Sequence, residues 1–390
     1  MRFIPFLSLL SFAAAAPVLA PREKSEIIPG KYIVVLKPES EQPAFSHILD
    51  LFGDGLDYKY EIGTFKGLSG SLTETLLTSV KNLASVAYIE QDAIVRTATF
   101  TTQSNASWGL GRISRREKGS TEYAFDDSAG EGTCSYIIDT GIYTEHPDFE
   151  GRATFLENFS GDGLERDGNG HGTHVAGTVG SKSYGVAKKT SLFAVKVLNS
   201  EGSGGNSGVI AGIAFAAKDA KKREAKGECK KGSVGNLSLG GIISTAQMQA
   251  VKAAVEDGLF LAVAAGNSAL PTILFSPANE PSVCTVGATD RNDKLASFSN
   301  YGSLVDVLAP GVEIESTWND GNTNTISGTS MASPHIAGLG AYLLGLEQRR
   351  SPAELCTRIQ GLSSKKKISS ALGAPLFLTN NYLAFNGVTP

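Results

Sequence analysis

Two kinds of hydrophobic patterning divide the chain. Residues 21–100 carry two runs rich in β-branched and aromatic side chains, Lys31–Lys37 and Val86–Arg96, which predict strands. Between these runs, apolar residues recur at helical spacing over Glu74–Leu83 and predict a helix. We therefore expect this first region to be a small α+β unit with a modest core of its own.

The pattern changes after Trp108, where short apolar runs alternate with longer segments of helical periodicity. Strands that alternate with helices indicate an α/β fold with a mostly parallel sheet covered on both faces. One helix, Ser333–Leu344, carries Pro334, which we place in its first turn, where proline is tolerated. The other predicted elements are strands at Cys134–Ile138, Ser191–Leu198, Val234–Leu239 and Leu259–Ala265, and helices at Val209–Asp219 and Thr245–Asp257.

The N-terminal segment is predicted to be a secretion signal. Arg2 supplies a positive start, Phe3–Val18 is almost unbroken apolar or small sequence, and Val18-Leu19-Ala20 resembles a signal-peptidase site. A membrane anchor is the alternative, but this run is short and rich in alanine, and no other segment is long enough to span a bilayer. We expect a signal over 1–20, the small unit over 21–100 and the main domain over 101–390, with the boundary in the polar stretch Thr97–Ser107.

The composition excludes several classes of protein. With 41% hydrophobic and 19% charged residues, the chain is not expected to be disordered in bulk. The net charge of −4 gives no electrostatic reason to expect a nucleic acid or an anionic membrane as partner. The four cysteines, Cys134, Cys229, Cys284 and Cys356, form no CxxC pair, so structural zinc is disfavoured. In an oxidising compartment we expect two disulfides, for which three pairings are open.

Candidate catalytic side chains follow the predicted strands. Asp139, Gly240 and Asn267 each come just after a strand. Catalytic groups in parallel sheets collect at the carboxyl ends of the strands, so we expect these residues at one edge of the sheet.

Among the five histidines, His171 stands out because Gly170 and Gly172 flank it. These glycines let the backbone approach closely and leave the imidazole reachable. Two other interpretations are a pair of packed helix histidines and a metal pair with His174. The HxxH spacing lacks the carboxylate of an HExxH motif, so zinc is disfavoured and His174, one turn later, is expected to be structural.

Ser330 lies in Ser327–Gly338, where a turn of small residues leads into an apolar helix. This position puts a hydroxyl and a free backbone N–H at a helix N-terminus, which suits a nucleophile beside developing negative charge. The alternative is a helix N-cap serine, which is very common.

Together these residues resemble a known enzyme family. The order Asp139, His171, Ser330, with these flanks, resembles the subtilisin-like serine proteases, and among them the proteinase K branch of secreted fungal, dermatophyte-type enzymes. The resemblance covers nearly all of Asn105–Asn386, and residues 21–100 resemble the inhibitory propeptide of that family. The matching blocks are Tyr136–Ile142, Asp167–His174, Leu237–Gly241, Val263–Asn267 and Ser327–Ala332.

The resemblance implies a subtilisin fold and a secreted serine endopeptidase made as a zymogen. Ser330 would attack the peptide carbonyl, His171 would transfer the proton, and Asp139 would orient the imidazole. The Asn267 side chain and the Ser330 backbone N–H would hold the oxyanion. One rival is a catalytically dead relative that acts as a binding module, which the four intact residues disfavour. The other rival is a zinc hydrolase built on His171 and His174.

The resemblance also implies that an extended substrate adds as a strand in the cleft. The walls of the first specificity pocket are small and uncharged, so a large apolar side chain fits, whereas a lysine would bury an unpaired charge. We expect broad specificity with this preference, looser at the fourth subsite, where Asn206 replaces an aromatic rim. The implied substrate-binding residues are Gly202, Ser203, Gly204, Ser238, Leu239, Gly240, Ala264, Ala265 and Gly266.

One structural calcium ion is implied, with no catalytic cofactor. The matching ligands are the carbonyls of Pro281 and Val283 and the carboxylate of Asp306, which are oxygen groups of the kind calcium prefers. A second, weaker site of this branch maps onto Arg116 and Lys367. Cationic side chains cannot ligate calcium, so we expect that site to be absent.

Covalent features complete the expectations. By resemblance, Cys134 pairs with Cys229, and Cys284 with Cys356. The precursor is expected to be cut after Phe100, at the end of an uncharged linker, and its propeptide then acts as an inhibitor.

We expect an extracellular monomer whose partners are protein and peptide substrates, with a role in nutrient release or in virulence through tissue invasion. Sequons at Asn105, Asn158 and Asn236 mark candidate glycosylation sites, of which Asn236 is doubtful because it lies on a predicted strand beside the cleft.

Overall fold

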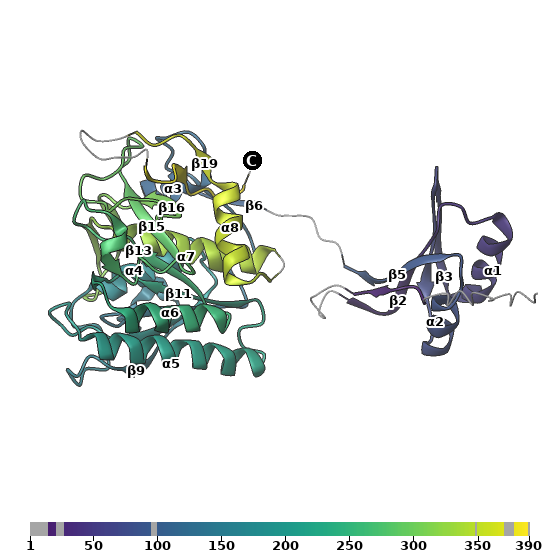
Figure 1. The fold of residues 1–390 in the computed structure, drawn as a ribbon, viewed down its shortest axis with the longest axis horizontal. Helices are drawn as coiled ribbons and strands as arrows, with labels where there is room; N and C mark the ends of the chain where they lie inside the picture. Colours follow the sequence, from purple (N-terminus) through teal and green to yellow (C-terminus); the bar gives the residue numbers. More distant parts are fainter. Residues whose placement is uncertain (1–14, 21–26, 95–99, 348, 370–377, 389–390) are drawn as a thin grey trace, which may run out of the picture. The chain divides into compact units, whose positions relative to one another are not determined.

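The computed structural model describes residues 15–20, 27–94, 100–347, 349–369 and 378–388, and the chain divides into two compact units. The first unit comprises Met1–Thr97 and the second comprises Ala98–Pro390 (Figure 1). Within the described residues, no helix combines the length and the apolar character that a membrane span requires.

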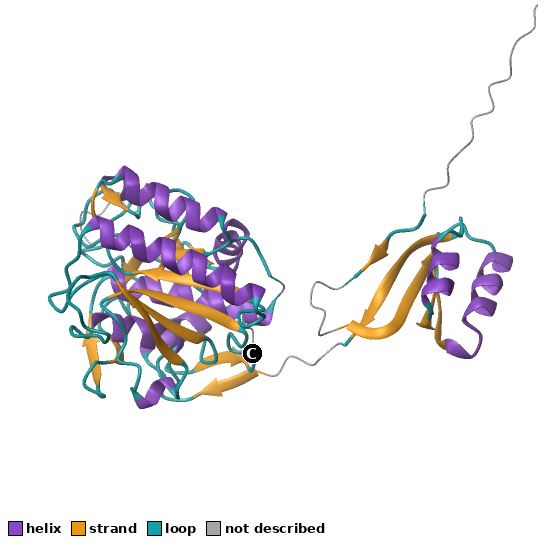
Figure 2. Ribbon diagram, turned by 90° about the horizontal axis from the view of Figure 1, so that it is seen from below, coloured by secondary structure: helices purple, strands orange, loops and turns teal. Residues whose placement is uncertain are grey.

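The first unit is a five-stranded sheet with the strand order β1-β5-β2-β4-β3. Both helices pack on the same face of this sheet (Figure 2), where the fully buried Val34, Ile48 and Ile89 belong to its core. Most of the expected signal lies outside the described residues, although Val18–Leu19 forms β1 and pairs with β5. The other elements are β2 (Ile27–Leu36), α1 (Gln42–Phe52), β3 (Leu56–Ile62), β4 (Phe65–Ser71), α2 (Glu74–Lys81) and β5 (Val86–Ala93).

The second unit is built on a nine-stranded sheet with the order β19-β20-β16-β15-β13-β11-β8-β10-β9. All neighbouring strands run parallel except the edge pair β19 and β20. The strands are β8 (Thr133–Asp139), β9 (Ala153–Asn158), β10 (Ser191–Lys196), β11 (Gly232–Leu237), β13 (Phe260–Ala264), β15 (Cys284–Thr289), β16 (Val307–Pro310), β19 (Ser364–Lys365) and β20 (Tyr382–Leu383). In the described part of this unit, three further strand pairs lie outside the sheet: β6 (Phe100–Gln103) with β7 (Tyr123–Asp126), β12 (Gly241–Ile242) with β14 (Phe275–Ser276), and β17 (Ile314–Thr317) with β18 (Thr323–Ile326).

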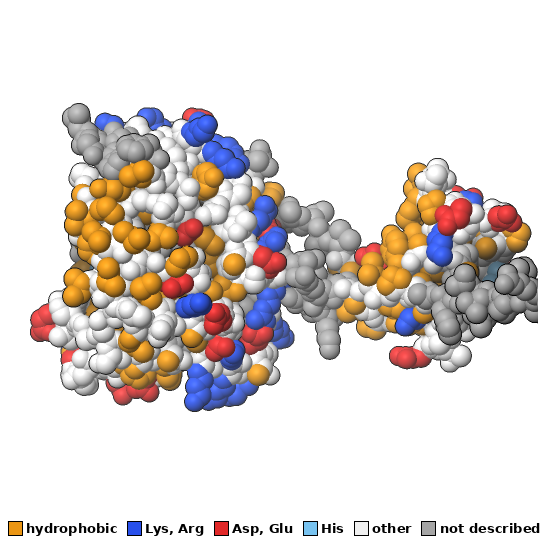
Figure 3. Space-filling view, in the orientation of Figure 1, with side chains coloured by type: hydrophobic (Ala, Val, Ile, Leu, Met, Phe, Trp, Pro, Cys, Tyr) orange, Lys and Arg blue, Asp and Glu red, His pale blue; other side chains and the backbone are white. Residues whose placement is uncertain are grey.

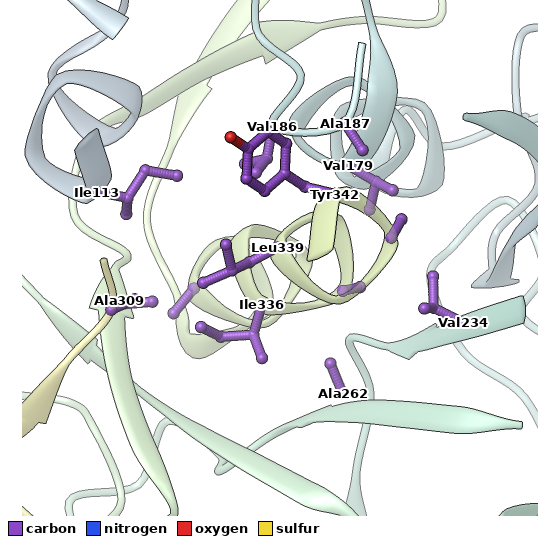
Figure 4. Packing of buried hydrophobic residues seen from close by; sticks show 14 of the residues in the cluster. Ile113, Val179, Val186, Ala187, Val234, Ala262, Ala309, Ile336, Leu339 and Tyr342 are labelled. Carbon is purple, nitrogen blue, oxygen red and sulfur yellow. The ribbon is translucent and has the colours of Figure 1, made fainter. Parts of the chain in front are cut away.

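Helices cover both faces of this sheet, which confirms the predicted α/β architecture. On one face, Ile336, Leu339 and Tyr342 of the central helix α7 pack among residues of the sheet and of α4 (Figure 4). On the other face, Ile213 of α5 and Val251 of α6 pack against alternate residues of the same strands. The helices are α3 (Trp108–Ser114), α4 (His171–Gly180), α5 (Asn206–Ala225), α6 (Thr245–Glu256), α7 (Thr329–Leu346) and α8 (Pro352–Leu362).

The predicted start of the last apolar helix was wrong. Helix α7 begins at Thr329, four residues earlier than expected, so Pro334 lies inside the helix rather than in its first turn. A proline has no backbone N–H, and it therefore leaves the carbonyl four residues earlier without its helical partner. That carbonyl belongs to Ser330, and another part of the chain supplies its hydrogen bond, as described below.

Candidate active site

Asp139 and His171 meet at the carboxyl end of β8. Asp139 is fully buried, and its Oδ1 lies 2.7 Å from Nδ1 of His171, the first residue of α4. Burial opposes the charged imidazolium, but the charge and hydrogen bond of Asp139 outweigh it, so the pKa of His171 is raised above its usual value. The imidazole therefore has one nitrogen fixed by a carboxylate and the other available for chemistry.

Asp167 fixes the N-terminus of α4, and sequence analysis did not identify this role. Its buried carboxylate accepts hydrogen bonds from the hydroxyls of Thr140 and Thr173 and from the backbone N–H of Gly170. Gly170 has a φ of +109°, and a side chain there would collide with the Trp318 ring, so glycine is required at this turn. The charge of Asp167 also helps to raise the pKa of His171.

Ser330 is the second residue of α7 and exchanges two hydrogen bonds with Ser238 in the neighbouring wall. The Ser330 hydroxyl donates to the Ser238 carbonyl at 3.1 Å, and the Ser238 hydroxyl donates to the Ser330 carbonyl at 2.8 Å. The hydrogen bonds of the described residues include none between the Ser330 hydroxyl and the His171 ring. Catalytic hydrogen bonds are often completed only when substrate is bound, and rotation about χ1 can release the hydroxyl.

One side-chain donor and one backbone donor lie close together beside Ser330. The Asn267 side-chain oxygen accepts hydrogen bonds from the N–H and the hydroxyl of Thr329, both at 2.8 Å, which leaves its Nδ2 as the outward-facing end. A Cβ placed on Gly328 would lie 3.5 Å from both Asn267 Nδ2 and the Ser330 backbone N. These two nitrogens therefore lie near one another beside Ser330, an arrangement that suits an oxyanion site.

Two adjoining hollows extend from these residues. A groove of about 540 Å³ contains His171 and is lined by Gly202, Ser203 and Gly204. A pocket of about 310 Å³ contains Ser330 and Asn267 and is lined by Ala264, Ala265 and Gly266. Leu239 and Gly240 line both, so the structure brings the predicted wall residues together around one cleft.

Exposed apolar side chains lie at and near the smaller pocket in the sequence. Ile242 lines this pocket and is 84% exposed. The next residue, Ile243, and Ile273, which lines a separate hollow, are also exposed by more than half. Apolar side chains gather on one flank of the second unit in the space-filling view, whereas Lys and Arg side chains lie mainly along its other edges (Figure 3).

A buried lysine behind the cleft was missed by the sequence analysis. Lys196 is fully buried, and its ammonium donates to the carbonyls of Thr140 and Leu198 and pairs with Asp162 at 3.0 Å. Lys196 thereby links Thr140, which follows Asp139, to Leu198, which lines the groove. In the sequence it is only one charged position within an apolar run, and that pattern alone gives no hint of burial.

His174 is structural, and its surroundings do not fit zinc. It is fully buried, its Nε2 donates to the Ile314 carbonyl at 2.9 Å, and burial lowers its pKa to about 4. Across the described ranges, the one group of three His, Cys, Asp or Glu side chains close enough to share a metal is Cys284, Asp306 and Cys356. Two of these are joined in a disulfide, so they offer no thiolate.

Of the implied calcium ligands, the Asp306 carboxylate has surroundings that suit a hard cation. The Asp306 carboxylate is mostly buried, which raises its pKa to about 6, and it accepts hydrogen bonds from Thr285 N and Gln360 Nε2. No cationic side chain pairs with it among the described residues, so a bound cation would compensate the cost of burying its charge. At the second implied position, Arg116 donates to Ser364 and Lys367 pairs with Glu117.

The sequons differ in their surroundings. Asn236 is fully buried on β11, where its amide donates to Ser238 and accepts from Ser333, so a glycan there is incompatible with the fold. This corrects the inclusion of Asn236 among the candidates. The Asn158 nitrogen already donates to Asp162, whereas Asn105 is exposed. The structure joins Cys134 to Cys229 and Cys284 to Cys356.

Comparisons with known proteins agree with this geometry. The subtilase family profile matches residues 130–372, and the peptidase inhibitor I9 profile matches residues 31–98. The chain is 51% identical to a cuticle-degrading protease of Metarhizium anisopliae, over 96% of this chain and 94% of that protein. It is 64% identical to proteinase T of Parengyodontium album, over 67% of this chain and 87% of that protein. The crystal structure of a cold-adapted subtilisin-like serine proteinase matches with a TM-score of 0.67 and 41% identity, over 73% of this chain and all of that one.

Proposed function

The chain belongs to the subtilase family of serine endopeptidases, and we propose that it is a secreted member, made as a zymogen, that uses Ser330, His171 and Asp139 as its triad. The observation that carries this proposal is the 2.7 Å contact between Asp139 and His171, in a cleft that also contains Ser330.

The chemistry follows from the positions of these groups. His171 takes the proton of the Ser330 hydroxyl as that oxygen attacks the peptide carbonyl, and it then protonates the leaving amine. Asp139 holds the imidazole in one orientation and stabilises its charged form. The oxyanion accepts hydrogen bonds from Asn267 Nδ2 and the Ser330 N–H, which need no rearrangement during the reaction.

The pocket chemistry supports a preference for large apolar side chains before the scissile bond. The residues that line the 310 Å³ pocket include no acid or base, and alanine, glycine, Ile242 and Phe275 supply much of its wall. A lysine or an aspartate would lose its hydration there without gaining a partner. Substrate backbone would pair with Gly202–Gly204 on one side and Ser238–Gly240 on the other, which supports broad specificity elsewhere.

The first unit is proposed to be the inhibitory propeptide, since the match to peptidase inhibitor I9 lies within it. Cleavage after Phe100 would separate it from the enzyme, and the apolar pocket suits that residue. We further propose that residues 1–20 direct secretion, that Asn105 is the best glycosylation candidate, and that Pro281, Val283 and Asp306 hold one calcium ion. A bound calcium ion would neutralise the buried carboxylate and brace the segment that precedes β15.

The proposal is tested by labelling and processing. A serine-directed phosphonylating reagent should inactivate the secreted enzyme and label Ser330, and a zinc-selective chelator should have no effect. Ser330→Ala should accumulate as uncut precursor, whereas the matched Ser327→Ala, an exposed serine of the same turn, should process and be labelled normally. N-terminal sequencing should place the mature start within three residues of Thr101. Normal processing of Ser330→Ala made alone, or a mature start beyond residue 108, would contradict the account.

A further inference from the structure

The groove that leads away from His171 has a charged side chain in its lining, which the smaller pocket lacks. Its lining includes Leu198, Val209 and Leu239, which are apolar, together with the acid Glu201 and the amide Gln247. The described residues that line it include no lysine or arginine, so the fixed side-chain charge that they supply without a protonated histidine is negative.

Glu201 is presented by a firmly held turn. The Asn199 side-chain oxygen accepts hydrogen bonds from the backbone N–H groups of Glu201 and Ser203, at 3.1 and 3.0 Å, and Asn169 donates to the Ser200 carbonyl at 2.9 Å. Gly202 completes the turn with a φ of +75°, which favours glycine. Among the described residues Glu201 has no salt-bridge partner, although its side chain is exposed at the groove. Its backbone is therefore fixed while its charge is available to a ligand.

Gln247 lies in the first turn of α6 and also lines the groove. Its backbone N–H is held by the Ser244 hydroxyl at 3.3 Å, and the residue is only 2% exposed. The side-chain oxygen is buried without a hydrogen-bond partner among the described atoms. An unpaired buried carbonyl oxygen is costly, and a donor group of a substrate that reaches this wall can satisfy it.

We propose that this groove is a subsite for an arginine or lysine side chain that lies two to four residues before the scissile bond. The aliphatic stem packs on Val209 and Leu239, Glu201 meets the positive charge near the solvent, and the Gln247 amide supplies a hydrogen bond at the wall. The inference rests on the proposed endopeptidase function. It assigns substrates that combine an apolar residue at the cut with a cationic residue upstream.

Fluorogenic peptides with phenylalanine before the scissile bond test this subsite. The second, third and fourth residues before the bond are varied in turn among lysine, its neutral isostere norleucine, arginine, citrulline, leucine and glutamate. The mature wild-type enzyme should prefer the cationic member of each isosteric pair at one of these positions by roughly two- to tenfold in kcat/KM. This preference should shrink at high salt, because Glu201 is exposed.

Variants then identify the groups responsible. Glu201→Gln should bring the ratio of kcat/KM for the lysine peptide to that for the norleucine peptide towards one. Gln247→Leu should raise the ratio of kcat/KM for the leucine peptide to that for the citrulline peptide. The matched control Glu256→Gln removes an exposed acid from α6 outside the groove and should leave both ratios unchanged. A wild-type enzyme without cationic preference at any of the three positions, or a ratio that Glu201→Gln does not alter, would overturn the inference. An enzyme that cuts none of the peptides would instead contradict the proposed function.

Discussion

Ser238 and Ser330 are joined by two hydrogen bonds in opposite directions, each from the hydroxyl of one residue to the backbone carbonyl of the other. The link exists because Pro334 removes the helical donor that would otherwise bond the Ser330 carbonyl. A wall of the proposed substrate groove is thus connected directly to the proposed nucleophile.

We predict that Ser238→Ala destabilises the enzyme by about 1–3 kcal/mol, because it leaves the Ser330 carbonyl without a partner in a buried setting. Pro334→Ala restores a helical N–H, so the double variant should lose less stability than Ser238→Ala alone. Part of the loss should remain, since the Ser238 hydroxyl also accepts from Asn236. Urea unfolding of the phosphonylated enzymes measures this coupling, and an equal cost of Ser238→Ala with and without Pro334 would refute it.

Thr329 is predicted to act as a positioning residue for Asn267. If Asn267 holds the oxyanion, as proposed, Asn267→Ala should lower kcat by roughly 10²–10³, the usual loss when one oxyanion donor is removed. Thr329→Ala should lower kcat by roughly three- to thirtyfold with little change in KM, because it removes one of two donors that orient the Asn267 amide. Thr329→Ser keeps the hydroxyl and should remain near wild type. Equal activity of the alanine and serine variants would argue against this role.

The pH dependence of activity should reflect the raised pKa of His171. As the general base it must be neutral, so kcat/KM should rise with pH and level off only above a pKa that exceeds 6.5. Asp167→Asn removes one negative charge near the imidazole and should shift this inflection to lower pH. The comparison is made at a temperature where melting curves show both proteins folded, and an inflection that moves upward would contradict the electrostatic account.

The free energy of unfolding should decrease as the pH falls, because two buried histidines other than His171 must become protonated. His174 and His335 are buried, and burial lowers both of their pKa values from 6.5 to about 4. Between these pH values the unfolded chain binds protons that the folded chain excludes, so stability decreases as the pH falls. The loss amounts to at most about 1.4 kcal/mol per pH unit for each histidine. Denaturant unfolding of phosphonylated enzyme over this range checks the slope, which His335→Gln should reduce; an unchanged slope would count against it.

Removal of calcium should lower the melting temperature without changing the triad. A cation bound only to the folded chain stabilises it by mass action, so the shift should grow with calcium concentration. Asp306→Ala should abolish the response, whereas Asp320→Ala, which removes an exposed acid in another loop, should retain it. Identical melting of the wild type with calcium and with chelator would speak against the site.

The sequence predicted the architecture well because most of its signal is local. The strands predicted at Cys134–Ile138 and Leu259–Ala265 differ from the observed β8 and β13 by one residue at each end. They could be located because buried parallel strands are continuous apolar runs. Helix α5 is longer than its apolar periodicity suggested. Its last residues, Lys221–Ala225, are strong helix formers that carry no apolar periodicity.

Contacts between residues that are distant in the sequence could not be predicted from local patterns of apolar and polar residues. The roles of Asp167 and Thr329 depend on side chains that meet only when α4 and α7 are docked on the sheet, and a charge within an apolar strand gives no sign that Lys196 is buried. The start of α7 was misplaced because Pro334 was assigned to a first turn. Only the tertiary bond from Ser238 shows why a proline is tolerated deeper in that helix.

Strand β6 has a consequence for the timing of maturation. Phe100 and Thr101, the residues on either side of the proposed cut, pair with Asp126 and Phe125 of β7, and the Thr101 hydroxyl donates to Asp127 at 2.7 Å. A bond held in a sheet cannot also lie extended along a protease cleft, so β6 must be unpaired when the chain is cut. If the chain is cut after Phe100, as proposed, pairing of Thr101–Gln103 with β7 would hold the new N-terminal segment in the sheet. That segment could then no longer lie extended in the cleft, so the pairing would favour a single cut.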